Sequence, residues 1–466
     1  MADLRPFFAP KSVAVVGAAE RATSSGGAVL QNLRISRYAG EIVPVNPKGE
    51  AMFGLATRRS LKDLDRPAEL AVIVIRPDLI LDVVREAAAT GHRHLLILPG
   101  GFAEAGEAGL ARDKELRALI AKENLTVVGP NCAGIIHLPR DARFAATFLR
   151  DMPPGPNRAG MAAFVTQSGA LGEEAIAAAN ALAIPLGTLV SVGNAIQLGV
   201  TDYLEYLGAQ DSISTVLLYI ESVEDGARFI KIARAVAARK PVVALIGGRT
   251  MAGAKAARNH TGAPALDESR IESLCREACL LRVKSLRSLL LAAKGFGAYP
   301  QGVGKRALIL SNSGGPGVIC ADECAAQGLD LADLPQAMHD KLRANLPPEA
   351  AVANPLDLLA DAREDRFGFT LESAIAEGKG AYDLLLGIHV VPFMVDAGPV
   401  VARVADLAKG VSIPFLYSMM GTLPGKAEWF ASLEAAGVPV FNDVEAMAEC
   451  AGLLARYPGL RTAAAK

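Results

Sequence analysis

The chain has 466 residues, enough for roughly three domains, and 51% of them are hydrophobic. Its 48 basic and 49 acidic residues give a formal net charge of −1, which does not favour a nucleic acid or an anionic membrane as partner. No apolar run reaches the ~18 residues that a membrane-spanning helix needs. Residues 1–11 lack the pattern of a signal peptide. We therefore expect a cytoplasmic protein that binds neither nucleic acid nor membrane.

Six cysteines are spread over the chain, with no CxxC pair. The spacings Cys275/Cys279 and Cys320/Cys324 place each pair on one face of a helix, without a nearby cluster of histidines or carboxylates. This pattern predicts small buried residues in a reducing compartment, and no metal site.

Residues 1–150 alternate apolar and helical segments, which predicts a Rossmann-like parallel sheet covered on both faces. The predicted strands are Ser12–Val16, Glu41–Val45, Leu70–Ile75, His94–Leu98 and Thr126–Val128. The first turn, Gly17 to Arg21, is not GxGxxG, and the second strand leads to Lys48 instead of an acidic residue. A lysine there suits a phosphorylated ribose, such as that of CoA, better than the bare diol of NAD. The alternative is that Lys48 is a solvated turn residue.

Two further α/β domains are expected at residues 155–295 and 300–466, each after a segment rich in proline or glycine. Their predicted strands are Ala162–Val165, Thr188–Ser191, Thr215–Ile220, Pro241–Ile246, Arg306–Leu310, Tyr382–His389 and Pro414–Tyr417. Thr166-Gln167-Ser168-Gly169 and Ser311-Asn312-Ser313-Gly314 both follow a strand and open a helix. This faint repeat predicts two related flavodoxin-like units.

The repeated turns are candidate phosphate sites, because a helix N-terminus offers unpaired N–H groups and a partial positive charge. Serine adds a hydroxyl donor, and glycine leaves room for the anion. The candidate residues are Ser168, Gly169, Ser313, Gly314 and Gly315.

His260 lies in the loop Arg258-Asn259-His260-Thr261-Gly262, after the strand that ends at Ile246. A neutral imidazole at a strand end can act as a nucleophile near pH 7. Glu221 ends the preceding strand, and its carboxylate could orient the ring. The alternatives are a surface histidine without a task, and a Glu221 that caps the helix starting near Asp225.

Together these segments resemble the α subunit of NDP-forming (ADP-forming) acyl-CoA synthetases, which is related to the α subunit of succinyl-CoA synthetase. The resemblance spans nearly the whole chain. It is carried by Ser12–Gly17, Val43–Lys48, Gly129–Gly134, Thr166–Gly169, Tyr219–Glu221, His260–Gly262, Ser313–Gly317 and Asn354–Asp357.

The resemblance implies a ligase that converts a small carboxylic acid, CoA and ATP into acyl-CoA, ADP and phosphate, through an acyl phosphate and a phosphohistidine. It implies that His260 takes the phosphoryl group with help from Glu221. It also implies a separate ATP-grasp β subunit that binds ATP or ADP with Mg²⁺, and hence a hetero-oligomer or a dimer. The implied CoA-binding residues are Gly17, Ala19, Arg21, Lys48, Pro77, Leu98, Pro99 and Gly100.

The chain departs from the family pattern at Asn259, where serine is usual, and at Pro264, which stiffens the histidine loop. It has no GxxxxGK[ST] loop either. A non-catalytic CoA- or acyl-CoA-binding protein of the same fold is therefore a second hypothesis. An NAD(P) oxidoreductase is a third, which the first turn and Lys48 disfavour. In the turn Gly129-Pro130-Asn131-Cys132, a strand-end role is preferred over a catalytic thiol.

Overall fold

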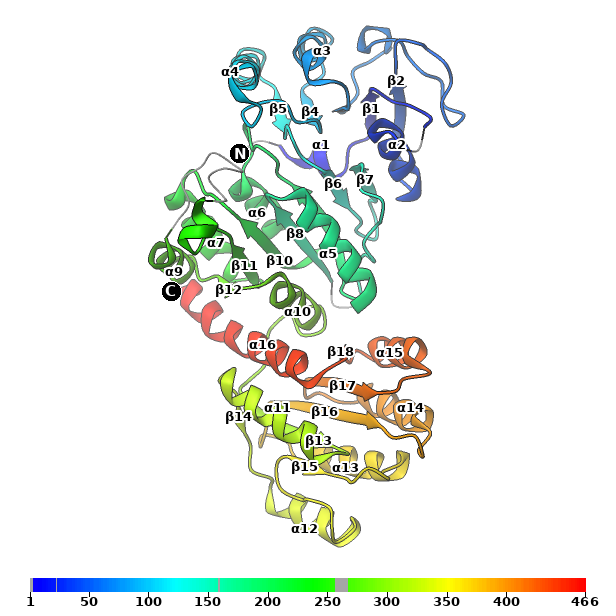
Figure 1. The fold of residues 1–466 in the computed structure, drawn as a ribbon, viewed down its shortest axis with the longest axis vertical. Coiled ribbons are helices and arrows are strands. Elements are labelled where there is room, and N and C mark those ends of the chain that lie inside the picture. The colour runs from blue at the N-terminus through cyan, green and yellow to red at the C-terminus, as the bar shows by residue number, and fades with distance from the viewer. Residues whose placement is uncertain (1–2, 22, 158–159, 256–266) are drawn as a thin grey trace. The chain divides into compact units, whose positions relative to one another are not determined.

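The computed structural model describes residues 3–21, 23–157, 160–255 and 267–466 (Figure 1). It divides the chain into two compact units, Met1–Leu290 with Ala464–Lys466, and Leu291–Ala463. Within the described residues, the first unit contains two sheets and the second unit contains one.

The first sheet is entirely parallel and has the order β2-β1-β3-β4-β5. Its strands are β1 (Ser12–Val16), β2 (Glu41–Val45), β3 (Leu70–Ile73), β4 (His94–Ile97) and β5 (Thr126–Val128). All residues of β1 and β3 are buried, as expected for a parallel sheet with helices on both faces. The helical elements of this part are α1 (Arg5–Phe8), α2 (Ser25–Ile35), η1 (Leu61–Asp63), α3 (Pro77–Ala89) and α4 (Gly106–Glu123).

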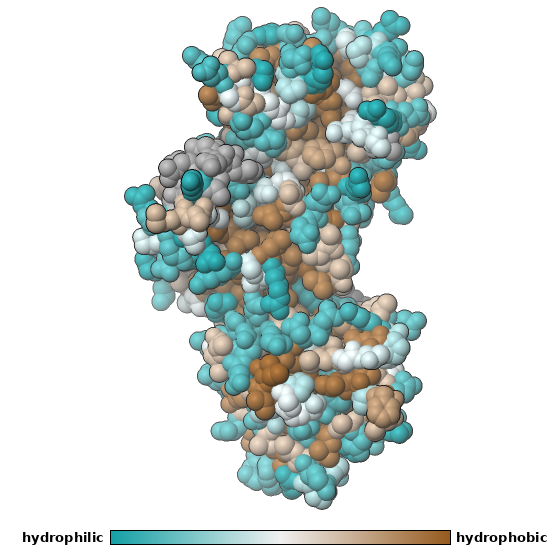
Figure 2. Space-filling view, viewed as in Figure 1, coloured by the Kyte–Doolittle hydropathy of each residue, from teal (hydrophilic) through white to brown (hydrophobic). Residues whose placement is uncertain are grey.

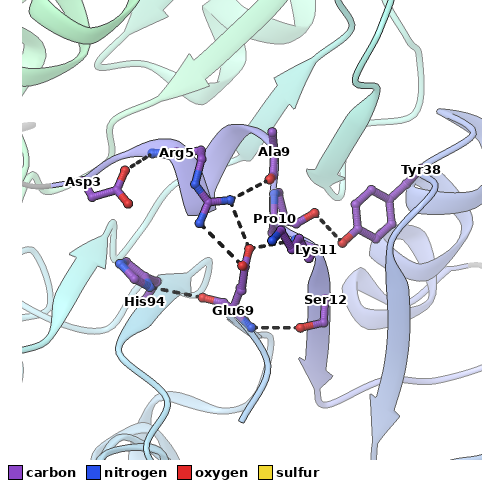
Figure 3. Close-up of polar contacts among 9 residues, drawn as sticks. All are labelled: Asp3, Arg5, Ala9, Pro10, Lys11, Ser12, Tyr38, Glu69 and His94. Atoms are coloured by element: carbon purple, nitrogen blue, oxygen red, sulfur yellow. Dashed lines mark hydrogen bonds and ion pairs between the residues drawn. The ribbon is translucent and has the colours of Figure 1, made fainter. Parts of the chain in front are cut away.

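The segment before β1 is fixed to the amino edge of this sheet by Glu69 (Figure 3). The Glu69 carboxylate accepts hydrogen bonds from the Arg5 guanidinium, at 3.3 Å, and from the Lys11 backbone N–H, at 2.8 Å. Its own N–H donates to Ser12 Oγ. Burial opposes ionisation, but the bonds from Lys11 and Arg5 hold the pKa of Glu69 below its usual value. These contacts lie at the amino edge of the sheet, and the opposite, carboxyl edge is the one where α/β proteins bind ligands.

The second sheet has the order β12-β11-β10-β8-β9-β6-β7. Its strands are β6 (Gly134–His137), β7 (Phe144–Thr147), β8 (Met161–Thr166), β9 (Leu186–Ser191), β10 (Ile213–Ile220), β11 (Val242–Ile246) and β12 (Leu281–Val283). Strands β8 to β12 are parallel to one another, whereas β6 runs antiparallel to both β7 and β9. Strands β6 and β7 therefore belong to the second sheet, although they lie within the range 1–150 expected for the first domain.

The helices around this sheet begin where the sequence places polar caps or glycine. They are α5 (Gly169–Leu182), α6 (Val200–Ala209), α7 (Gly226–Ala237) and α9 (Glu268–Glu277). Helix α10 (Leu286–Phe296) follows β12 and contains the boundary between the two units. Ser168, Asp225 and Asp267 each accept a hydrogen bond from the third residue beyond them, as N-cap residues do.

The second unit has a parallel sheet of order β14-β13-β16-β17-β18, with β15 paired to β13. Its strands are β13 (Arg306–Ser311), β14 (Asp330–Leu331), β15 (Leu356–Asp357), β16 (Leu384–Val391), β17 (Phe415–Gly421) and β18 (Val440–Phe441). Its helices are α11 (Gly314–Ala326), α12 (Gln336–Asn345), α13 (Glu364–Glu377), α14 (Ala397–Ala408), α15 (Lys426–Ala435) and α16 (Val444–Ala465).

On the face shown in Figure 2, hydrophilic and hydrophobic residues are interspersed over both units. No helix within the described residues is long and apolar enough to cross a membrane. All six cysteines are buried, as predicted, and none forms a disulfide.

Candidate active site

Three neighbouring strands of the second sheet end beside one another and bring predicted site residues together. Strands β8, β10 and β11 run parallel, with Thr166 opposite Tyr219 and Ile220 opposite Ile246. Their carboxyl ends therefore share one edge of the sheet, where α/β proteins hold ligands. Ser168 and Gly169 leave β8 there, and Glu221 leaves β10.

Ser168 is the N-cap of α5, and its hydroxyl accepts a hydrogen bond from the Leu171 N–H. The turn is closed by Thr166, whose hydroxyl donates to the Ser168 carbonyl (2.8 Å) and accepts from the Ser168 N–H (3.0 Å). The 14-residue helix α5 thus begins directly at the sheet edge with its first N–H groups there, an arrangement that suits an anion.

Gln167 joins this turn to Glu221. Its side-chain carbonyl accepts the N–H groups of Glu221, at 2.5 Å, and Ser222, at 3.1 Å. Its side-chain amide donates to the Ser222 carbonyl, at 3.2 Å. Because both ends of the amide are used, the backbone that carries Glu221 is held against the start of α5.

The Glu221 side chain is 7% exposed, and its Oε1 accepts a hydrogen bond from the Tyr219 hydroxyl at 3.1 Å. Burial and the nearby carboxylate together raise the pKa of Tyr219. Glu221 is not a helix cap, because α7 begins five residues later, at Gly226, and is capped by Asp225. The alternative of a capping role for Glu221 is therefore wrong.

The segment that follows β11 starts beside Glu221. The Gly247 N–H donates to the Ile220 carbonyl at 2.8 Å, and a Cβ at residue 247 would lie 3.7 Å from Glu221 Cγ. This segment leads to residues 256–266. His260, Asn259 and Pro264 are among them and lie outside the described residues, so the predicted meeting of His260 with Glu221 stays a prediction.

The repeat predicted from sequence has the same geometry in the second unit. Ser311 closes the turn by donating to the Ser313 carbonyl (2.8 Å) and accepting from the Ser313 N–H (3.0 Å). Asn312 binds both the N–H and the carbonyl of Val390, at 2.8 and 2.9 Å. Val390 thus occupies the place that Glu221 has in the first unit, without a carboxylate.

Ser313 is the N-cap of α11, but its side chain makes no capping bond. Gly314 lies near Asp357, since a Cβ at residue 314 would be 3.2 Å from Asp357 Oδ2, whereas a Cβ at residue 315 would have no atom within 4 Å. These three candidates lie in the second unit, whereas Ser168, Gly169 and Glu221 lie in the first.

A cavity of about 350 Å³ opens at the carboxyl edge of the first sheet. Gly17, Leu98 and Pro99 line it, three of the residues implied for CoA. Its other lining residues are Ser24, Ser25, Gly26, Val74, Ile75, Arg76 and Phe148.

Helix α2 begins at this cavity. Ser24 caps it by accepting the Gly27 N–H at 3.1 Å, and Gly26 packs so closely that a Cβ would lie 2.1 Å from the Gly17 carbonyl oxygen. The cavity therefore combines a helix N-terminus, hydroxyls and Arg76, which together fit a phosphate-bearing ligand such as CoA.

The remaining residues implied for CoA are not among those that line this cavity. Arg21 and Lys48 are exposed, and Ala19, Pro77 and Gly100 are half-buried. Sequence reasoning missed Ser24, Ser25, Arg76 and Phe148. The run Ser24-Ser25-Gly26-Gly27 carries a helix-start signal that could have indicated the first two, whereas Phe148 comes from a segment far along the chain.

Cys132 is 4% exposed, and its thiol lies 3.4 Å from the Ile97 carbonyl. Burial raises the pKa of Cys132 to about 12, so the thiol stays protonated at neutral pH and is a poor nucleophile. This supports the strand-end role preferred for this turn. Among the residues that the structure describes, no group of histidine, cysteine and carboxylate side chains is placed to hold a metal ion.

The fold and the site define a multi-domain α/β protein whose strand-end turns suit phosphate-bearing ligands. Models of a CoA binding domain, a succinyl-CoA ligase like flavodoxin domain and a ligase-CoA domain match residues 11–138, 159–296 and 307–464, respectively. The α subunit of ADP-forming acetate–CoA ligase II of Pyrococcus furiosus is 33% identical over 451 residues, 96% of each chain. The ADP-forming acetate–CoA ligase of Methanocaldococcus jannaschii is 33% identical over 360 residues. These cover 77% of this chain but only half of that protein.

Among solved structures, the dinucleotide-forming acetyl-coenzyme A synthetase 1 of Ca. Korarchaeum cryptofilum, in complex with phosphate and ADP, matches with a TM-score of 0.91 and 28% identity. The match covers 99% of this chain and 98% of that one. The chain belongs to the family of ADP-forming acyl-CoA ligases, in which it corresponds to the α subunit.

The predicted fold class and family are thereby confirmed. The expectation of an acid–thiol ligase is confirmed over that of a non-catalytic carrier, since the curated relatives are ligases.

Proposed function

We propose that this chain is the α subunit of a two-polypeptide ligase that joins a small carboxylic acid to CoA at the expense of ATP, releasing ADP and phosphate. A separate ATP-grasp β subunit would bind the nucleotide with Mg²⁺. The match covers 96% of a relative named as an α subunit but only about half of two ligases named without a subunit, which supports two separate polypeptides. We place the complex in the cytoplasm, where its six unpaired cysteines would stay reduced.

CoA would bind at the carboxyl edge of the first sheet. The start of α2, with Ser24 and Ser25, and the Arg76 guanidinium offer N–H and O–H donors to its phosphates. Lys48 would reach the ribose phosphate from the end of β2, and Leu98, Pro99 and Gly100 would border the thiol arm. The 350 Å³ cavity has the size of a small-molecule site and would hold part of the ligand.

The second sheet would carry out phosphoryl transfer. In the direction of synthesis, a His260 ring nitrogen forms a bond to the γ-phosphorus of ATP while the bond to the ADP oxygen breaks. A substrate carboxylate oxygen then takes the phosphoryl group from His260, giving an acyl phosphate. Attack of the CoA sulfur on the acyl carbon expels inorganic phosphate. Glu221 would orient the ring and stabilise its charge, and the start of α5 at Ser168 and Gly169 would neutralise the phosphoryl oxygens. Ser313, Gly314 and Gly315 would play the corresponding part in the second unit.

The observation that carries this proposal is the meeting of Gln167, Ser168 and Glu221 at one edge of the sheet, beside the strand that leads to His260. A buried carboxylate next to an open helix start is what a phosphohistidine site needs, because one group stabilises the imidazolium and the other the phosphoryl oxygens.

The test combines the full chain with an ATP-grasp partner subunit, ATP, Mg²⁺, CoA and a panel of carboxylates. We expect acyl-CoA formation by the wild type and its loss, by at least ~100-fold, in His260→Ala. His339→Ala is the matched control, since His339 is a partly exposed histidine on α12. Equal rates in His260→Ala and His339→Ala would reject the mechanism, and no acyl-CoA with any carboxylate would reject the function.

A further inference from the structure

Three polar side chains meet at the carboxyl edge of the first sheet, beside the predicted place of the CoA thiol arm. Glu104 lies in the turn after β4, Asn131 in the turn after β5, and Asn194 in the turn after β9 of the second sheet. Backbone bonds hold the three segments together: the Asn131 N–H donates to the Pro99 carbonyl and the Asn194 N–H to the Pro130 carbonyl, both at 2.9 Å. The backbone positions of the three residues are therefore fixed relative to one another.

The Glu104 carboxylate sets the direction of the hydrogen bonds in this cluster. It accepts the backbone N–H groups of Gly101, at 2.5 Å, and Phe102, at 3.2 Å, and it also accepts from the Asn194 side-chain amide. Burial opposes ionisation, but the bonds from Asn194 and from the Gly101 and Phe102 N–H groups hold the pKa of Glu104 below its usual value. The group is thus an anion at neutral pH, and an anion can only accept.

Because Glu104 can only accept, it fixes the orientation of the Asn194 side-chain amide and, through it, that of Asn131. Because Asn194 must turn its NH₂ group to Glu104, its carbonyl oxygen faces Asn131, whose NH₂ group donates to it at 3.2 Å. The carbonyl oxygen of Asn131 is thereby turned toward Gly100, where a Cβ would lie 3.0 Å from it. Gly100 follows Leu98 and Pro99, which line the cavity at this edge.

We propose that Glu104 is a positioning residue for CoA: it fixes the orientation of Asn194 and Asn131, so that Asn131 Oδ1 accepts a hydrogen bond from a donor of the pantetheine arm. This inference rests on the CoA site proposed above. Pantetheine carries amide N–H groups and a thiol, which can donate to this side-chain acceptor, and the predicted place of the arm is beside Leu98, Pro99 and Gly100. Gly100 has no side chain that would block this approach.

The test measures binding of CoA and of adenosine 3′,5′-bisphosphate, which lacks the arm, to the full chain by titration calorimetry. In Glu104→Gln the new amide can donate as well as accept, so Asn194 is no longer held in one orientation. We expect CoA binding to weaken about tenfold, while bisphosphate binding stays unchanged. Glu107→Gln, three residues away in the first turn of α4, is the matched control and should bind both ligands as the wild type does.

Unchanged CoA affinity in Glu104→Gln, or an equal loss for both ligands, would overturn the proposal while leaving the CoA site itself intact. A wild type that binds neither ligand would overturn the CoA site and this proposal together. Should Glu104→Gln fail to fold, Asn194→Ala breaks the same relay without touching the bonds from Glu104 to the Gly101 turn, and the same selective loss of CoA is expected.

Discussion

Glu221 and Val390 occupy corresponding positions beside two similar turns, and the two sites differ in the chemistry of this residue. An amide side chain, Gln167 in the first unit and Asn312 in the second, fixes the end of the neighbouring strand in the same way. Only the first of these strand ends carries a carboxylate. In the proposed mechanism, β10 therefore supplies a carboxylate beside the start of α5. At the start of α11 the strand end that Asn312 holds is apolar, and the nearby carboxylate is that of Asp357 in β15.

Glu221→Gln tests this difference. We expect phosphohistidine formation from ATP, in the presence of the partner subunit, to fall by about 100-fold, because a neutral amide stabilises the imidazolium far less. Tyr219→Phe removes only the hydroxyl that donates to Glu221 and should lose no more than a few-fold. The measurement is the amount of acid-labile phosphate on the chain. If Glu221→Gln formed as much of it as the wild type, the Glu221 carboxylate would have a structural role only.

The sequence was sufficient to predict residues at the ends of strands, and insufficient for contacts between distant segments. Glu221, Ser168 and Gly17 could be placed because an apolar run predicts a strand and its end predicts an edge of the sheet. The bonds from Gln167 to Glu221 and from Asn194 to Glu104 join residues 54 and 90 positions apart. No local pattern encodes such pairs.

At the scale of elements, the cavity proposed for CoA depends on how closely α2 approaches the turn after β1. Gly26 and Gly17 meet there with no room for a side chain. Gly17 also has a φ of 90°, which an L-residue with a side chain rarely adopts. The glycines of this turn serve close packing of helix on strand, although the turn lacks the dinucleotide-binding pattern.

Gly26→Ala should therefore damage both stability and binding. The added Cβ would lie 2.1 Å from the Gly17 carbonyl oxygen, so α2 must shift, and we expect the free energy of unfolding to fall by about 1–3 kcal/mol. CoA affinity should fall as well, since the start of α2 moves. Gly226→Ala is the control: it lies at the start of α7 with no atom within 4 Å of a Cβ, and should change stability by less than ~1 kcal/mol. Equal denaturation midpoints for the two variants would contradict this packing argument.

Asn312→Ala should destabilise the second unit. The substitution leaves the N–H and carbonyl of Val390 without their partner in a site where Asn312 is 1% exposed, at a cost of about 1–3 kcal/mol. Asn345→Ala, which removes an exposed bond to the Lys341 carbonyl within α12, serves as comparison and should cost much less. Chemical denaturation followed by a probe in the second unit would measure the difference.

Strand prediction failed where pairing, not hydrophobic pattern, decides the structure. Strands β6 and β7 have four residues each. Strand β6 pairs antiparallel with β7 and also with β9, which comes about 50 residues later in the chain. Strands β14, β15 and β18 have two residues each. Such short segments gain their extended form from a neighbouring strand, so their own sequence predicts them poorly.

At the scale of the whole molecule, each unit buries a histidine that must stay neutral. Burial lowers the pKa of His137 in the first unit and of His389 in the second to about 4, from an ordinary 6.5. His137 bonds to the Thr188 hydroxyl at 2.8 Å. Neither ring nitrogen of His389 has a hydrogen-bond partner among the residues that the structure describes. Both units should therefore be sensitive to acid.

The lowered pKa of each histidine determines how the free energy of unfolding changes with pH. Between pH 6.5 and 4 the unfolded chain binds a proton that the folded chain does not, so stability falls as pH falls, by up to about 1.4 kcal/mol per pH unit for each histidine. His389→Leu should remove this dependence from the second unit, and the partly exposed His339→Leu should not. Unfolding measured from pH 7 to pH 4 checks this, and parallel pH profiles for the two variants would refute it.

Strands β6 and β7 follow the first sheet in the chain but pair within the second, and this limits where the protein can be cut into fragments. A fragment cut near residue 150 would carry two strands away from their partner, and the complementary fragment would present the bare edge of β9 to solvent, where unpaired N–H and carbonyl groups invite self-association. The chain segment up to residue 150 thus contributes strands to both sheets of the first unit. Fragments or gene fusions that are meant to keep the sheets intact need their boundary before Gly134 or after the last strand of the second sheet.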